Sequence, residues 1–321
     1  MDYDSSMNSP LPIVVFITHH ANELLWSALR SALNSQGWIK EIWVIHSHSD
    51  ESNIPDEFSH HVRYQWLGGN LGFAAAVNWV FTHAKGPVFI INDDTLLEED
   101  CLEELYNAAI RYPNSVLQPE IRLFEHPDTI ENTGHYVGLD GTNHAYERGQ
   151  PSKYNGTSER LCFSGAAFWI PECIYTHPKL GSMDTSLSPF GEDVDYALRC
   201  VRYGFNIRCV HNARLLHHWG GSYDRYSDEK VIWVESHRIQ SKFRNLPTWM
   251  WFAAPLSSAM RYGMGFQDSR VPAGKSRSAA LASIKGIYSG YKALPLAIRK
   301  RRQEDFVVSD WEFTKLWWRQ T

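Results

Sequence analysis

One stretch decides the expected fold: Val88-Phe89-Ile90-Ile91-Asn92-Asp93-Asp94-Thr95. Four apolar residues are followed directly by an amide, two carboxylates and a hydroxyl. A central strand of a parallel sheet has this pattern when its carboxyl end carries ligands into a crevice. Two adjacent carboxylates repel each other, and Mg²⁺ or Mn²⁺ would relieve that repulsion while also contacting substrate phosphates. The alternative is a polar turn that caps the helix expected from Glu98.

Strand and helix patterns alternate on both sides of this stretch. Besides the strand that ends at Asn92, apolar runs predict strands at 13–18, 41–46, 62–67, 115–118, 161–170, 206–210 and 214–218. Helical spacing predicts helices at 22–33, 73–83, 98–111 and 193–202. The alternation predicts an α/β domain over residues 11–244, with a mostly parallel sheet flanked by helices. Between residues 120 and 160 the periodicity fades, so a loop or hairpin region that faces the substrate is expected there.

Composition excludes several classes of protein. The 321 residues carry a net charge of −5, which indicates no nucleic-acid partner. The five cysteines are widely spaced without a C-x-x-C pair, so neither a disulfide scaffold nor a zinc knuckle is expected. The first twelve residues lack the features of a signal peptide, and no apolar run is long enough to span a bilayer. These features predict a cytoplasmic protein.

The C-terminal region, residues 245–321, has a different character. Residues 270–321 contain 11 Lys or Arg and 4 Asp or Glu, a balance of +7, so the preceding 269 residues carry −12. Helical spacing, many aromatic residues and the basic cluster 299–302 predict a helical region, and Ser309-Asp310-Trp311-Glu312 is a capping-box pattern. Two interpretations remain open. Residues 246–321 lie on an anionic membrane surface, at the inner face of the cytoplasmic membrane, or they pack on the α/β body or a partner.

Three further stretches contain residues that suit ligand binding or catalysis. Gly68 to Asn78 is a turn of small residues before a helix, which suits phosphate binding but matches neither the dinucleotide fingerprint nor the P-loop. Pro189 to Asp195 presents Glu192 and Asp193 at a helix start, where a carboxylate can act as general base or simply complement the helix dipole. His217 and His218 follow an apolar run, where a histidine can complete a metal site that carboxylates begin.

Five motifs in this order resemble those of family 2 glycosyltransferases with the GT-A fold, especially the bacterial rhamnosyltransferase-like branch. They are Asn70-Leu71-Gly72-Phe73-Ala74 with Asn78, Asn92-Asp93-Asp94-Thr95, Gly165-Ala166-Ala167-Phe168, Glu192-Asp193-Val194-Asp195 with Arg199, and His217-His218-Trp219-Gly220-Gly221-Ser222. The resemblance covers about residues 13–244. It implies metal-dependent, inverting transfer of a sugar from a nucleotide-sugar donor to a polysaccharide or lipid-linked glycan acceptor. A dTDP- or UDP-sugar is expected rather than a GDP-sugar.

The resemblance also implies residue roles. Asp193 would be the catalytic base with Glu192 beside it, and Mn²⁺ or Mg²⁺ would be held by Asp94, Asp93 and His217 or His218. The nucleotide would be lined by Thr18, His46, Asn70, Gly72, Phe73, Asn78, Asn92, Asp93 and Gly165.

Two departures from the family pattern stand out. His46 occupies the position where the family usually has a base-binding Asp, and Asn92 replaces the first acid of the metal motif. Two other functions therefore stay open: a sugar-1-phosphate nucleotidyltransferase, and a non-catalytic subunit of the same fold that binds glycans or assembles a complex.

Overall fold

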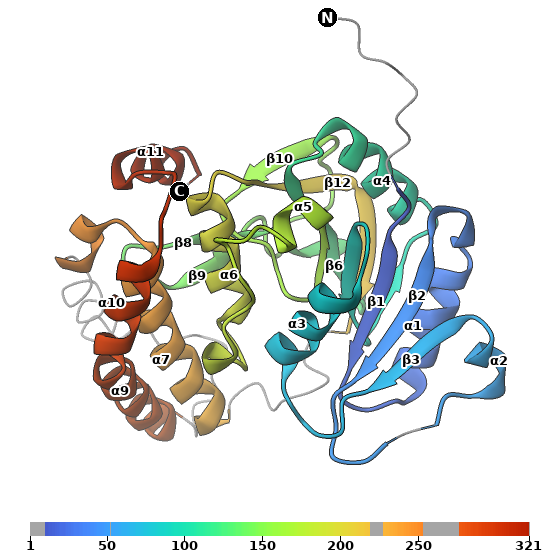
Figure 1. Ribbon diagram of the computed structural model, residues 1–321, viewed down its shortest axis with the longest axis horizontal. Coiled ribbons are helices and arrows are strands. Elements are labelled where there is room, and N and C mark those ends of the chain that lie inside the picture. Colours follow the sequence, from blue (N-terminus) through green and yellow to red (C-terminus); the bar gives the residue numbers. More distant parts are fainter. Residues whose placement is uncertain (1–9, 52, 219–226, 253–275, 321) are drawn as a thin grey trace, which may run out of the picture.

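The structure is a computed structural model that describes residues 10–51, 53–218, 227–252 and 276–320 (Figure 1). Two predicted features therefore lie outside the described residues: the Trp219-Gly220-Gly221-Ser222 end of the last motif, and the Met-rich run from 253 to 266.

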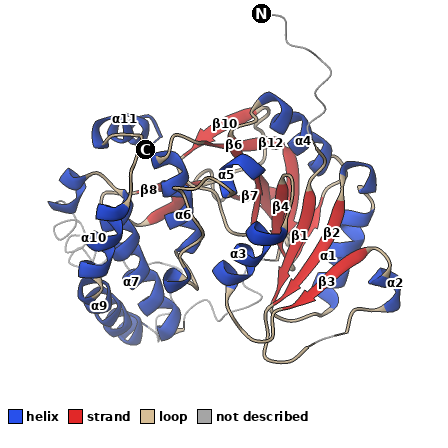
Figure 2. Cartoon of the chain, in the orientation of Figure 1, coloured by secondary structure: helices blue, strands red, loops and turns tan. Residues whose placement is uncertain are grey.

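A large mixed sheet forms the centre of the molecule (Figure 2). Within the described residues, its strands follow the order β10-β12-β6-β11-β4-β1-β2-β3, with β5 beside β12 and β7 beside β6. Their bounds are β1 (Ile13–Thr18), β2 (Glu41–His46), β3 (Val62–Trp66), β4 (Val88–Asn92), β5 (Thr95–Leu97), β6 (Ser115–Leu123), β7 (His126–Asn132), β10 (Thr157–Arg160), β11 (Ala167–Ile170) and β12 (Asn206–His217). A separate hairpin pairs β8 (His135–Val137) with β9 (Asn143–Ala145).

Strand direction brings the predicted motifs to one edge. Parallel pairing joins β3, β2, β1 and β4, and β6 pairs parallel with β12. Because β11 pairs antiparallel with both β4 and β6, all six of these strands point the same way. Their carboxyl ends, and the amino end of β11, therefore meet at one edge of the sheet.

Helices cover both faces of the sheet. Val14 and Phe16 of β1 pack toward α1 (Glu23–Leu33) and α4 (Cys101–Arg111). Ile13, Val15 and Ile17 pack toward α3 (Phe73–His83) and α6 (Glu192–Arg202). Short helices α2 (Asp56–Ser59) and α5 (Glu172–Tyr175) and two 3₁₀ turns, η1 (Gln36–Trp38) and η2 (Thr185–Leu187), complete this body. This arrangement confirms the α/β class with flanking helices.

Several predicted strand bounds differ from the observed ones. Strand β6 continues to Leu123 because it pairs with both β12 and β7 beyond residue 118. The two strands expected at 206–210 and 214–218 are one strand, β12, interrupted by a register shift between Val210 and Arg214. Residues 161–166 are irregular rather than strand, with a turn at 165–166 in which the backbone N–H of Ala167 bonds back to the carbonyl of Ser164 at 3.3 Å.

The C-terminal region is helical, as expected, with α9 (Ser276–Lys292), α10 (Leu294–Gln303) and α11 (Asp310–Gln320) after α7 (Asp228–Asn245). Helix α11 packs on the body, because Phe313 and Trp317 are buried in the same core as β1. The indole N–H of Trp317 also donates to the carbonyl of Val137 at 2.5 Å. Ser309 and Glu312 form the expected capping box, with reciprocal bonds of 2.9 and 3.2 Å.

Buried ion pairs tie these helices to the body. Asp195 of α6 accepts hydrogen bonds from Arg199 at 2.9 Å, from Arg244 at 3.2 Å and from Asn245 at 2.7 Å. In the basic cluster, Lys300 pairs with Asp184 and Arg301 with Asp310. Packing on the body therefore accounts for part of the basic tail.

Helices α7 and α9 approach closely through glycines. A Cβ added at Gly286 would lie 2.7 Å from the carbonyl oxygen of Ile232, and one at Gly290 would lie 2.9 Å from Cβ of Ile239. Helix α7 ends at Asn245, next to the predicted domain boundary at residue 244, and packs against α9. The division into two domains at that boundary remains a prediction. None of the described helices combines the length and the apolar character needed to cross a bilayer.

Candidate active site

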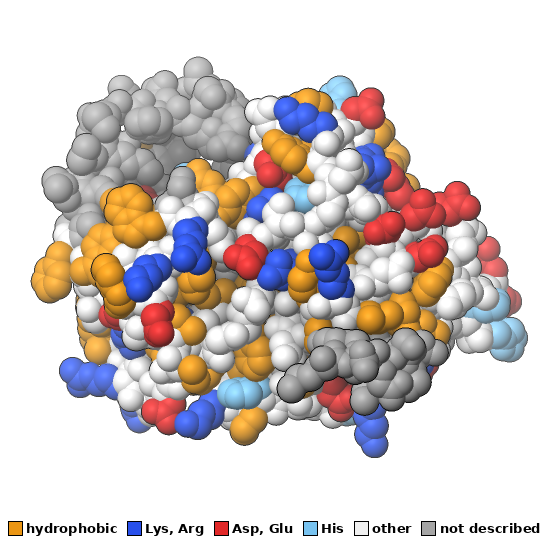
Figure 3. Space-filling view, turned by 90° about the horizontal axis from the view of Figure 1, so that it is seen from above, with side chains coloured by type: hydrophobic (Ala, Val, Ile, Leu, Met, Phe, Trp, Pro, Cys, Tyr) orange, Lys and Arg blue, Asp and Glu red, His pale blue; other side chains and the backbone are white. Residues whose placement is uncertain are grey.

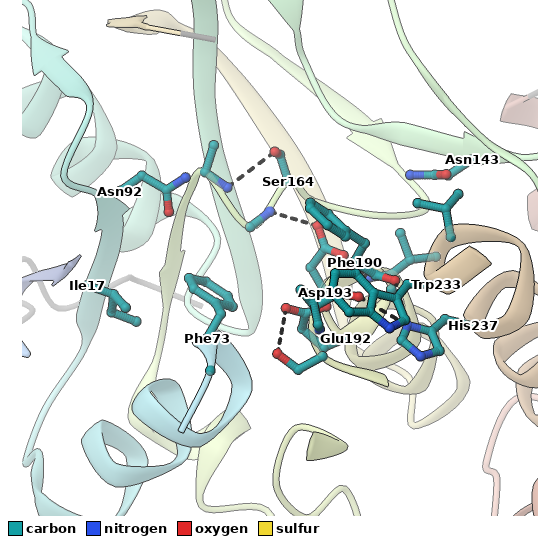
Figure 4. Close-up of a pocket in the computed structure, with 18 of the residues that line it drawn as sticks. Ile17, Phe73, Asn92, Asn143, Ser164, Phe190, Glu192, Asp193, Trp233 and His237 are labelled. Atoms are coloured by element: carbon teal, nitrogen blue, oxygen red, sulfur yellow. Dashed lines mark hydrogen bonds between the residues drawn. The ribbon is translucent and has the colours of Figure 1, made fainter. Parts of the chain in front are cut away.

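The carboxyl edge of the sheet opens into a cavity of about 780 Å³. It is lined by eleven of the residues predicted for the site: Thr18, Asn70, Gly72, Phe73, Asn92, Asp93, Asp94, Gly165, Glu192, Asp193 and His217. In Figure 4, Ile17, Phe73 and Asn92 lie on one side, and Glu192, Asp193, Phe190, Trp233 and His237 lie on the other. Segments more than a hundred residues apart in sequence thus face one space.

The Asp93-Asp94 turn at the end of β4 is held by its neighbours. Thr18, the last residue of β1, donates to Oδ2 of Asp93 at 2.5 Å. The backbone N–H of His218 donates to the carbonyl of Asp94 at 2.9 Å. Burial, and to a smaller extent the charge of Asp94, raise the pKa of Asp93 to about 6, although the bond from Thr18 opposes this. Burial therefore makes the Asp93 carboxyl group of this turn costly to ionise.

Asp94, His217 and Glu131 form a buried line of side chains. Nδ1 of His217 lies 2.8 Å from Oε2 of Glu131, and Nε2 lies 3.2 Å from Oδ1 of Asp94. The second contact lacks the alignment of a hydrogen bond, so Oδ1 of Asp94 is buried with no hydrogen-bond partner among the described residues. Burial disfavours the charged ring, but the two carboxylates outweigh it and raise the pKa of His217 to about 10.

This arrangement fits a divalent cation. A carboxylate oxygen without a partner faces an imidazole nitrogen, and the other nitrogen of that ring is oriented by a second carboxylate, as in many metal sites. A cation between Asp94 and His217 would replace the ring proton. Residues 219–226, which follow His217 and His218, are outside the described residues.

Asp193 lies at the amino end of α6 and lines the same cavity as the Asp93-Asp94 turn. Its Oδ2 accepts from the backbone N–H of Gly165 at 2.9 Å, and its Oδ1 accepts from the N–H of Val194 at 2.8 Å. A side chain at position 165 would crowd this contact, because an added Cβ would lie 3.3 Å from Oδ2 of Asp193 and 3.5 Å from the ring of Phe73. Glycine at 165 thus lets β11 approach the carboxylate.

Glu192 is buried beside Asp193. Its Oε1 accepts from Ser188 at 3.2 Å, while Oε2 has no hydrogen-bond partner in the described part of the chain. Burial, and then the charge of Asp193, raise the pKa of Glu192 to about 8. Near neutral pH the Glu192 side chain is therefore mostly protonated.

Residues 70–73 supply another part of the cavity wall. Gly72 is the N-cap of α3 with φ of 79°, a conformation that favours glycine, and it faces the hydroxyl of Ser188. The backbone N–H of Leu71 donates to Ser47 at 2.9 Å, which fixes the turn against the end of β2.

Three predicted site residues are not on the cavity wall. His46 is fully buried, with Nδ1 2.8 Å from the hydroxyl of Tyr64. Asn78 bonds the backbone N–H and carbonyl of Met183 at 2.8 and 2.9 Å, which ties α3 to the following loop. His218 stacks on Phe124 with ring centroids 3.4 Å apart.

Other cavity residues were not singled out from the sequence. The stretch 120–160 does face the cavity, through Glu131, Asn132, His135, Gly141, Asn143, Ala145 and Arg148. Helix α7 adds Lys230, Trp233, Val234, His237, Arg238 and Ser241, and no sequence signal marked these. Nδ1 of His237 lies 3.0 Å from the carbonyl of Phe190, so α7 holds the loop that leads to Glu192 (Figure 4).

The fold and this site define the chain as a protein of the GT-A glycosyltransferase architecture. The crystal structure of GalNAc-T7 with UDP, GalNAc and Mn²⁺ aligns with a TM-score of 0.62 at 13% identity, over 92% of this chain and 58% of that one. The structure of Staphylococcus aureus TarS 1-349 aligns with a TM-score of 0.50 at 12% identity, over 95% of this chain and 92% of that one. Identities this low show the fold alone, and this chain spans only 58% of the GalNAc-T7 structure.

A family model identifies the domain more closely. Residues 13–166 match the model of Glycosyl transferase family 2, which is 154 of 321 residues. No curated protein matches the sequence significantly. This match and the fold together support a glycosyltransferase.

Proposed function

We propose that the protein is a metal-dependent, inverting glycosyltransferase of the rhamnosyltransferase-like branch, which moves a hexosyl or deoxyhexosyl group. The donor is a dTDP- or UDP-sugar, and the acceptor is a hydroxyl of a polysaccharide or lipid-linked glycan. One observation carries the proposal: Asp193 and the Asn92-Asp93-Asp94 turn line the same cavity. The Mn²⁺ and UDP named for the GalNAc-T7 crystal add support for a metal and a nucleotide donor.

In this proposal the cavity has a donor wall and an acceptor wall. Thr18, Asp93 and the 70–73 turn bind the nucleotide, and Asp94 with His217 holds the cation. That cation would neutralise charge on the leaving diphosphate. Phe190 and Trp233, with ring centroids 6.5 Å apart, offer the acceptor sugar apolar ring faces on the other side.

Asp193 is the base in this proposal. The N–H groups of Gly165 and Val194 fix its carboxylate in one orientation, so that it can take the proton of an acceptor hydroxyl as that oxygen attacks. Glu192, protonated near neutral pH, leaves the pair with a single negative charge and so avoids a second charge beside the base.

Transfer assays with Mn²⁺ or Mg²⁺ test these roles. Asp193→Asn should lower kcat by about 10²–10⁴-fold. Asp94→Asn should weaken cation binding, so that transfer needs a higher concentration of Mn²⁺ or Mg²⁺. Asp100→Asn is the matched control, because Asp100 is exposed and makes no side-chain capping bond. Undiminished transfer by Asp193→Asn would refute the base assignment. Screening nucleotide sugars for thermal stabilisation would identify the donor.

The same samples test the two other functions. Pyrophosphate release from a nucleoside triphosphate and a sugar 1-phosphate would indicate a nucleotidyltransferase. Glycan binding without any nucleotide or cation binding would indicate a non-catalytic subunit.

We also propose that α9 and α10 lie on an anionic membrane surface. The two helices contain seven Lys or Arg and no Asp or Glu, of which Lys285, Lys292, Arg299 and Arg302 are exposed. Beside them, Leu281, Ile284 and Tyr288 are 61, 62 and 71% exposed. In Figure 3 many of the acidic side chains on this face gather on the right, on the side away from the C-terminal helices.

Vesicle sedimentation tests this surface. Binding to vesicles with anionic lipid should weaken with salt, and Lys285→Glu with Lys292→Glu should cost about 1 kcal/mol or more per residue. Ile284→Asn should weaken binding, whereas Ile110→Asn, at an exposed position of α4, should not. Equal binding to neutral vesicles would contradict the proposal.

A further inference from the structure

Three histidines gather at the edge of the cavity, and the site described above uses none of them. His19 and His20 follow β1, and His48 lies two residues after β2. Ring centroids are 4.4 Å apart for His19 and His20, 4.7 Å for His19 and His48, and 4.9 Å for His20 and His48. One ring nitrogen from each lies within 4.8 Å of the other two.

Strand pairing holds the three residues together. Thr18 and His46 are partners in the parallel β1–β2 ladder, so the residues that follow them leave the sheet side by side. The N–H of Ser47 donates to the carbonyl of Thr18 at 3.0 Å, and the indole of Trp66 donates to the carbonyl of His48 at 3.0 Å. The backbone beneath the cluster is thus fixed, while the His20 side chain is exposed.

The hydrogen bonds of His19 prepare it to bind a cation. Its Nδ1 lies 2.8 Å from the carbonyl oxygen of Ser47, and a carbonyl can only accept. Nδ1 must therefore carry the proton, which leaves the lone pair on Nε2. Histidines that bind metals commonly donate their second nitrogen to a carbonyl in this way.

His48 can take part after a change of tautomer. Its Nδ1 accepts from the N–H of Asp50 at 3.1 Å, so the neutral ring carries its proton on Nε2. Exchange to the other tautomer would free Nε2 and give up the bond from the Asp50 N–H; the Asp50 carboxylate lies 3.9 Å from Nδ1.

We propose that His19, His20 and His48 form a binding site for a borderline-soft divalent cation, of which Zn²⁺ is the best fit. Three imidazoles and one open position make up a common zinc geometry. Zinc–nitrogen bonds of about 2.1 Å in a tetrahedron place ligand nitrogens about 3.4 Å apart, so the rings must close inward by about 1 Å. The exposed ring of His20 is free to make that movement.

The donor atoms separate this site from the Asp94 and His217 site. Imidazole nitrogens favour zinc, nickel and copper, whereas a carboxylate site also accepts magnesium and manganese. His19 and Thr18 both line the cavity, so a cation on the three histidines would sit at the edge of the proposed nucleotide region. The inference rests on the three rings and holds whether or not the proposed transfer reaction is correct.

Titration of Zn²⁺ into the untagged, full-length protein tests the inference, with Co²⁺ as a visible-absorbance probe of tetrahedral coordination. His20→Ala and His48→Ala should each weaken Zn²⁺ binding at least tenfold. His60→Ala is the matched control, because His60 and His61 are also an adjacent exposed pair but are not in the cluster. Asp94→Asn should leave this Zn²⁺ binding unchanged.

Two outcomes would overturn the inference. Zn²⁺ binding by wild type that His20→Ala and His48→Ala do not alter would place the cation elsewhere. Loss of UDP or dTDP binding in these variants, with Zn²⁺ binding unaffected, would assign the histidines to the nucleotide instead. Circular dichroism of each variant shows whether a loss of binding is caused by a loss of folding.

Discussion

Replacing Glu192 by Gln should make the stability of the protein less dependent on pH, so that the variant gains stability relative to wild type as the pH rises. The Glu192 side chain is buried, and its pKa is raised from 4.5 to about 8 by burial and by the charge of Asp193. The folded protein therefore binds this proton more tightly than the unfolded chain does. Its contribution is fully present below about pH 4.5 and is lost as the pH rises through about 8. Gln has no proton to lose, so the variant escapes this loss.

The size of the effect follows from the two pKa values. Each pH unit between them costs the wild type about 1.4 kcal/mol of unfolding free energy. Stability of the variant relative to wild type should thus rise by about 3 kcal/mol between pH 4 and pH 7, and by about 5 kcal/mol up to pH 9. The new amide N–H₂ replaces Oε2, which has no partner in the described structure, and this costs about 1–3 kcal/mol at every pH. The test is therefore how the stability difference between variant and wild type changes with pH, because the cost of the amide is the same at every pH.

Urea unfolding followed by tryptophan fluorescence, repeated from pH 4 to pH 9, measures this slope. Glu57→Gln is the control, because Glu57 is exposed in its surface pair with Arg30. A difference between Glu192→Gln and wild type that stays constant with pH would refute the view that Glu192 is protonated near neutral pH.

Three further predictions concern packing and ion pairs. Asp195→Asn should lower the unfolding free energy by about 3–5 kcal/mol, because it leaves the buried guanidinium of Arg199 without its carboxylate partner; urea unfolding measures it, and a loss below 1 kcal/mol would contradict it. Gly286→Ala should cost about 1–3 kcal/mol by forcing α9 away from α7, whereas Gly37→Ala, with open space around it, should be nearly neutral in the same thermal melts. Trp317→Ala should lower the unfolding free energy by about 3–5 kcal/mol, because Trp317 is buried in the same core as β1. An unchanged melting temperature would show that α11 contributes little to this core.

Local patterns in the sequence were sufficient for much of the fold. The strand 88–92 and the helix over 73–83 occur where periodicity predicted them, since apolar spacing directly reports which face of an element is buried. The strand expected at 161–170 was too long, because the turn before β11 is set by bonds to distant partners such as Asp193.

The candidate site shows the same division. Asp93, Asp94 and Asp193 stood out because carboxylates directly after an apolar strand or at a helix start can be recognised from the sequence alone. Glu131, Trp233 and His237 did not, because they lie in aperiodic or ordinary helical sequence and reach the cavity only through the path of the chain. His46 and Asn78 lie in the expected segments, but their side chains bond neighbouring elements and do not reach the cavity wall.

By itself, then, the sequence determined the α/β alternation, the acidic turn after Ile91 and the order of the motifs, because each depends on residues close together in the chain. The tertiary structure decided which of those residues meet. Parallel strands bring Thr18, Asn92 and His217 to one edge, and β11 brings Gly165 to Asp193. It also decided that Nε2 of His217 lies 3.2 Å from Oδ1 of Asp94, a relation between residues 123 positions apart that no local pattern contains.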